Sequence, residues 1–114
     1  MNFSNPMFII PAVTGPLIII IGIIFLLYPP KKINGIYGYR TKSSKKSIEL
    51  WHFAQSYSSK KIILAGILML LFSLSGLFID LRTSTAALLG LFFVIFPLSL
   101  MMKLTEDAIK KKFD

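Results

Sequence analysis

Residues 62–79 read IILAGILMLLFSLSGLFI and contain no charged side chain. A helix of this length covers about 27 Å, close to the hydrocarbon thickness of a bilayer. Two other runs, residues 7–28 and 83–102, are also free of charge. Hydrophobic residues make up 54% of the 114, more than a soluble domain of this size can bury. The sequence therefore predicts an all-α membrane protein with three transmembrane helices in a single domain.

Prolines and short polar segments set the expected boundaries of these helices. Pro16 predicts a kink in the first helix, and Pro29-Pro30 predict its end. The turn between the last two helices is short, so these two should form an antiparallel hairpin. The expected order is a helix at about 7–28, a loop at 29–61, a helix at 62–79, a turn at 80–85, a helix at 86–102 and a tail at 103–114.

Basic residues are distributed unequally between the two expected sides of the membrane. Eight lie in the loop at 29–61 and four in the tail at 103–114, whereas Arg82 alone lies in the turn. Cytoplasmic segments carry the excess of Lys and Arg. We therefore expect the loop and the tail in the cytoplasm and the N-terminus outside. The tail is expected to form a short surface helix beside anionic lipid headgroups.

The formal net charge of +8 is thus explained by topology and by contact with anionic lipid, and no nucleic-acid partner is expected. The apolar runs hold no Asp, Glu, Lys, Arg or His, which argues against a proton-coupled pump. Cysteine is absent, and Glu49 with His52 would need further ligands to bind a metal. We expect no metal, no cofactor and no enzymatic activity.

The loop at 29–61 reads PPKKINGIYGYRTKSSKKSIELWHFAQSYSSKK. Its first half contains the turn residues Asn34-Gly35 and Gly38. In its second half Ser44 can cap a helix that places Trp51 on an apolar face beside lysines. This pattern predicts a short amphipathic helix in the membrane interface, with Tyr39 and Trp51 as interfacial anchors.

The sequence leaves three possibilities for Arg40. It can form an ion pair with Glu49, the only acid of the loop, bind a carboxylate or phosphate of a ligand or lipid, or remain exposed to solvent without a partner. Small residues such as Ala86 and Gly90 allow close helix packing, either within one bundle or in a homo-oligomer. Both sets of alternatives stay open at this stage.

The loop also resembles a known family. Asn34, the segment Gly38-Tyr39-Arg40-Thr41, Ser44 and a helix with Trp51 and Ala54 are similar to the N-x-x-x-G-Y-R-T-P-x-S and W-x-x-A pattern of the SdpI family of bacterial membrane proteins. The flanking spans match in number and placement. Lys42 departs from the pattern, because the family often has proline there.

The resemblance implies a role in immunity and signalling rather than a reaction, in the bacterial cytoplasmic membrane. The named member of the family protects against a secreted antimicrobial peptide and sequesters a transcriptional repressor. We therefore expect the basic loop to bind a toxic peptide or a cytoplasmic regulator. The alternative is an oligomeric small transporter or channel subunit with Arg40 and Glu49 at its cytoplasmic mouth. The expected binding residues are Asn34, Gly38, Tyr39, Arg40, Thr41, Ser44, Glu49, Trp51 and Gln55.

Overall fold

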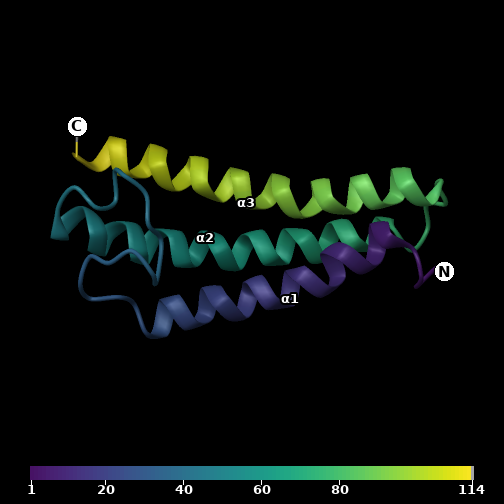
Figure 1. Cartoon of the computed structure of the whole chain (residues 1–114), viewed down its shortest axis with the longest axis horizontal. Helices are drawn as coiled ribbons and strands as arrows, with labels where there is room; N and C mark the ends of the chain where they lie inside the picture. The colour runs from purple at the N-terminus through teal and green to yellow at the C-terminus, as the bar shows by residue number, and fades with distance from the viewer. Residues whose placement is uncertain (114) are drawn as a thin grey trace.

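The computed structural model describes residues 1–113 and consists of three long helices (Figure 1). Their bounds are α1 Pro6–Leu27, α2 Ile48–Ser75 and α3 Thr83–Phe113. All three are long and apolar enough to cross a membrane. The long axis of the molecule measures 48 Å, more than the roughly 30 Å of a hydrocarbon core. The predicted all-α class with three membrane-spanning helices is confirmed.

The two ends of the bundle differ. Residues 28–47 fold back against the helices at the end where α3 finishes, and we call this the loop end (Figure 1). The N-terminus and the connection from α2 to α3 lie at the opposite end, which we call the turn end. Asn5 caps α1 there, and its side-chain Nδ2 donates to the carbonyl oxygens of Gly76 at 2.7 Å and Ile79 at 3.0 Å. This contact ties the start of α1 to the end of α2.

The separate amphipathic helix expected in the loop is not what the structure shows. Its residues form the first turns of α2, which continues without a break from Ile48 to Ser75. The N-cap is Ser47, whose hydroxyl accepts from the Leu50 amide at 3.1 Å, and the expected cap at Ser44 is wrong. Residues 48–61 contain neither glycine nor proline, so nothing interrupts the helix before the apolar run.

The expected separate tail helix is also part of a longer element. α3 extends past the apolar run to Phe113, because residues 103–112 are mostly strong helix formers. Lysines at 110–112 occupy the last turn, where positive charge stabilises the carbonyl end of a helix. This extension carries polar residues of α3 to the level of the loop.

Small residues bring the helices into direct backbone contact. A Cβ atom on Gly66 would lie 2.7 Å from the Gly15 carbonyl oxygen, and one on Gly90 would lie 2.7 Å from the Pro6 carbonyl oxygen. Glycine at such positions allows the close approach on which helix association in lipid depends. α1 therefore packs tightly against both other helices.

Candidate functional site at the loop end

The centre of the site is a pair of hydrogen bonds between the Gln55 side chain and the Tyr39 backbone. Gln55 Oε1 accepts from the Tyr39 amide, and Gln55 Nε2 donates to the Tyr39 carbonyl oxygen, both at 2.7 Å. Gln55 is 2% exposed. A buried carboxamide is costly unless both of its ends are bonded. These two bonds satisfy it and hold the loop against α2.

Gly38 makes this close approach feasible. Its φ is +97°, a conformation that residues with a Cβ rarely adopt. A Cβ atom would also lie 2.5 Å from Gln55 Oε1 and 2.6 Å from Pro30 Cγ. The glycine of the motif is therefore explained both by its backbone conformation and by the space available to it.

Three hydroxyl groups of the loop converge on one carboxylate of α3. Tyr39 Oη donates to Glu106 Oε2 at 2.7 Å, and Thr41 Oγ1 donates to the same oxygen at 3.0 Å. Ser43 Oγ donates to Glu106 Oε1 at 2.6 Å. Tyr39 and Thr41 lie in the irregular segment, and Ser43 lies in the turn at residues 42–45 that follows it. We call Tyr39, Thr41, Ser43, Gln55 and Glu106 the loop site.

The environment sets the protonation of this cluster. Burial and the hydrogen bond to Glu106 raise the pKa of Tyr39, so the phenol stays a donor. Burial raises the pKa of Glu106, but bonds from Ser43, Tyr39 and Thr41 outweigh it and hold that pKa below its usual value. A depressed carboxyl pKa stabilises the fold above the unfolded value of about 4.3, and the contribution is lost as pH falls through the folded pKa. The cluster is therefore intact at neutral pH.

Other motif residues shape the loop around this centre. Ser44 is buried, and its Oγ accepts from the Thr41 amide at 2.9 Å. Asn34 Oδ1 accepts from the amides of Ile36 at 2.9 Å and Tyr37 at 2.7 Å, as Asn side chains do in turns. Both side chains replace backbone partners that an irregular segment lacks.

Trp51 is a buried residue rather than the expected interfacial anchor. It is 0% exposed, and its Nε1 donates to the Pro30 carbonyl oxygen at 2.8 Å. One residue further on, His52 Nε2 lies 2.9 Å from the Lys31 carbonyl oxygen. The start of α2 thus fixes the chain where it leaves α1. Tyr39 is also buried, at 7% exposure, and is not an anchor in the interface.

The structure does not bring Arg40 and Glu49 together. Both are exposed, and the Arg40 Nη1 group donates to the Ile36 carbonyl oxygen. The ion pair that the structure of residues 1–113 gives is Lys103 with Asp107, at 3.2 Å. Arg40 follows Tyr39, whose backbone is held beside Gln55. Gln55 is six residues from Glu49, or about 9 Å along the helix. Of the three possibilities for Arg40, the structure does not support the ion pair with Glu49.

Ser43 and Glu106 were not predicted from the sequence. Ser43 lies in the turn at residues 42–45, and its contact with Glu106 depends on how that turn folds. Glu106 carried no local signal, since only the uninterrupted α3 helix brings it to the loop. Within residues 1–113 no three His, Asp or Glu side chains lie close enough together to hold a metal ion.

Three apolar helices with a folded polar loop at one end define a small multi-pass membrane protein. The model of the SdpI/YfhL protein family matches residues 31–103, most of the chain, and the chain belongs to this family. The match contains the motif, α2 and most of α3, whereas Glu106 lies just outside it.

A curated relative is the uncharacterized protein YfhL of Bacillus subtilis (strain 168), which is 47% identical over 57 residues. The aligned segment is 50% of this chain and 52% of the relative, so the chain spans about half of that protein's length. No solved structure matches the chain.

The loop site predicts coupled variants. Tyr39→Phe and Glu106→Gln should each lower the free energy of unfolding by about 1–2 kcal/mol, since each weakens a hydrogen bond to a charged group. The double variant should lose clearly less than the sum, because the two side chains share one interaction. Chemical unfolding in detergent can be followed by the fluorescence of Trp51, which is buried and is the single tryptophan.

Matched controls exist for both changes. Tyr57→Phe removes a tyrosine hydroxyl from the part of α2 near Gln55. Asp107→Asn neutralises an exposed acid, which is the residue after Glu106. Each should change the free energy of unfolding by no more than about 0.5 kcal/mol. Strictly additive losses for Tyr39 and Glu106, or controls that lose as much, would contradict the site.

Proposed function

We propose that this chain is an immunity or signalling protein of the bacterial cytoplasmic membrane, whose loop end faces the cytoplasm and binds a partner. The family, the fold and the basic loop support this role together. The observation that carries it is the division of the motif into an internal part and an exposed part. The internal residues fold the loop, and the exposed ones are available to a partner.

The exposed part is basic and includes an apolar side chain. Ile36 is 88% exposed, and its carbonyl oxygen accepts from Arg40. We use the name exposed rim for five exposed residues of the loop, which are Ile36, Arg40, Lys42, Lys45 and Lys46. A folded loop that presents such residues binds at a lower entropic cost than a flexible one, because its backbone is already ordered.

The charge of the exposed rim favours one of the two partner classes. Membrane-active peptides are typically rich in Lys and Arg, and like charges across an interface are repulsive. A cytoplasmic regulator with acidic groups is complementary to Arg40 and the lysines. We therefore propose that the loop binds an acidic regulator directly. Protection against a toxic peptide would then result from the signal that this binding produces.

The transporter or channel alternative needs Arg40 and Glu49 at one mouth of an oligomer. Both side chains are exposed at the loop end, but they form no pair in the part of the chain that the structure describes. The alternative thus gains no specific support from the geometry.

The proposed orientation predicts a labelling pattern. A cysteine at Ser84 should react with an impermeant thiol reagent in intact cells, and one at Lys45 should react only after the membrane is permeabilised. Both positions are exposed, so burial does not affect the comparison, and the absence of native cysteine makes each label specific. The reverse pattern would place the loop outside and exclude a cytoplasmic partner.

The proposed partner contact predicts a selective effect of arginine. With a photoreactive residue at Ile36, cells should yield a crosslink to a cytoplasmic protein. Arg40→Ala should lower this yield at least about fivefold, as expected from the loss of about 1 kcal/mol of binding free energy. Arg82→Ala, at the turn end, should leave it unchanged, and it removes the same charge.

Survival of a peptide-sensitive bacterium gives a second readout. Expression of the chain should raise survival during exposure to the peptide, and Arg40→Ala should abolish the gain at equal protein level. Unchanged killing across several membrane-active peptides, together with crosslinks that do not depend on Arg40, would contradict the proposed function.

A further inference from the structure

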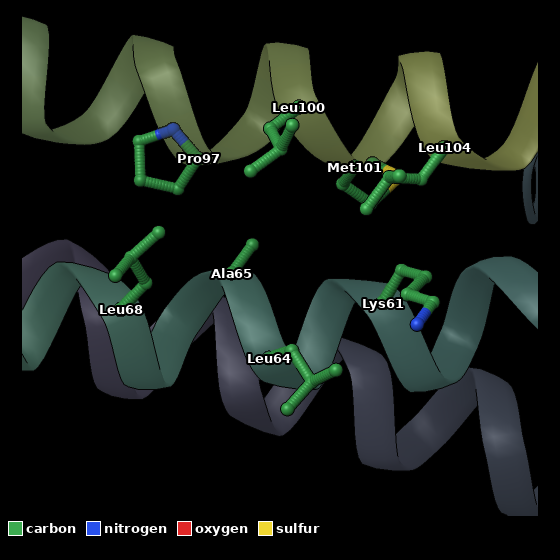
Figure 2. A pocket seen from close by; sticks show the side chains of 8 residues that line it. All are labelled: Lys61, Leu64, Ala65, Leu68, Pro97, Leu100, Met101 and Leu104. Atoms are coloured by element: carbon green, nitrogen blue, oxygen red, sulfur yellow. The ribbon is translucent and has the colours of Figure 1, made fainter.

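A groove runs between α2 and α3. Its volume is about 170 Å³. Figure 2 shows Ala65 and Leu68 pointing from α2 toward Pro97 and Leu100 of α3. The complete lining is Lys61, Leu64, Ala65, Leu68, Pro97, Leu100, Met101 and Leu104. All of these are apolar except Lys61, which lies at the end of the row nearest the loop end.

The groove is elongated along the axes of α2 and α3. Lys61 and Leu68 are seven residues apart, about 10 Å along the axis of α2. Leu64, Leu100 and Leu104 are exposed, so the groove opens to the surroundings of the bundle along its length. Such a shape, apolar along the membrane depth and charged at one end, matches a lipid chain below a headgroup.

A second hollow continues the first toward the loop end. Leu104 lines both, and the second also contains Lys111 and Lys112 of the last turn of α3. Its floor includes Phe53 and Tyr57, whose rings stack with centroids 5.7 Å apart.

Lysines lie over both of these rings. Lys61 Nζ is 5.2 Å from the Tyr57 ring centroid, and Lys112 Nζ is 4.7 Å from that of Phe53. One acid, Asp107, also lines the second hollow, and its ion pair with Lys103 offsets its charge. The end of the groove that continues into the second hollow is therefore positively charged, and the ammonium groups of two lysines lie over aromatic rings.

We propose that this groove binds one anionic phospholipid, with an acyl chain against Ala65, Leu68 and Leu100 and the phosphate between Lys61 and the lysines of the last turn of α3. Charge complementarity favours this occupant. A phospholipid has a negatively charged phosphate at one end and an apolar tail, and the groove has lysines at one end and apolar side chains along its length. The site is a fixed position for one lipid, which goes beyond a general attraction of basic segments to the membrane surface.

A second copy of the chain is a poorer occupant. A two-fold contact through this groove would place the same surface of both copies face to face. Lys61, Lys111 and Lys112 of one copy would then approach those of the other, and like-charge contact is unfavourable.

Tryptophan quenching by brominated lipid tests the proposal on the full chain in vesicles. Leu100→Trp places a reporter in the groove. Ile20→Trp places one on an exposed site of α1, next to Ile19, which lies against Gly66 at the level of Ala65 in the groove. The vesicles are of phosphatidylcholine and contain a minor fraction of brominated phosphatidylglycerol or, in the parallel arm, brominated phosphatidylcholine.

The groove reporter should be quenched about fivefold more effectively by phosphatidylglycerol than by phosphatidylcholine, the equivalent of about 1 kcal/mol. The Ile20→Trp reporter should show a smaller preference. Adding Lys61→Gln should remove most of the preference at Leu100→Trp. Adding Lys60→Gln, an equal change of charge at the adjacent exposed residue, should leave it intact.

Two outcomes would overturn the proposal. Equal preference at the two reporters means that the groove holds ordinary surrounding lipid. Absence of quenching of Leu100→Trp by either lipid means that protein covers the groove, as in a complex with a second copy. Trp51 contributes the same buried background in every variant, so the comparisons hold between variants.

Discussion

The structure of the loop end depends on one requirement: the polar chain that leaves α1 must find hydrogen-bond partners before it enters α2. Gln55 and Glu106 meet this requirement from two different helices. Gln55 bonds both polar groups of the Tyr39 backbone, and Glu106 accepts from the Tyr39 side chain. Tyr39 is thus the point where the loop, α2 and α3 meet. Because unsatisfied buried polar groups are costly, these contacts fix the loop in one arrangement.

This arrangement separates folding from recognition within one short motif. Gly38, Tyr39 and Trp51 face inward and support the loop, whereas Arg40 lies between them in sequence and faces outward. A motif of this kind preserves its shape through its internal residues while its exposed rim meets the partner. The same helix extension that brings Glu106 to the loop also carries the lysines of α3 to the second hollow of the groove.

The sequence predicted the helices well and the loop only in part. Uncharged runs are a direct physical requirement of the bilayer, so the three helices could be found without a structure. The region of the site was also found, because Tyr39, Thr41 and Gln55 all belong to the motif. The partner Glu106 could not be found, since it lies 67 residues from Tyr39 and its role depends on the length of α3. The interfacial reading of Trp51 assumed a surface helix, whereas the helix is continuous and the indole is covered by the returning chain.

Hydrogen exchange of the Tyr39 backbone amide, measured by NMR on the protein in lipid nanodiscs, tests the central claim most directly. This amide lies in a loop but donates to a buried side chain. We expect the Tyr39 amide to exchange as slowly as amides inside α2, far more slowly than that of the exposed Lys32, and Gln55→Ala to remove this protection. Exchange of the Tyr39 amide as fast as that of Lys32 in the unaltered protein would show that Gln55 does not hold the loop.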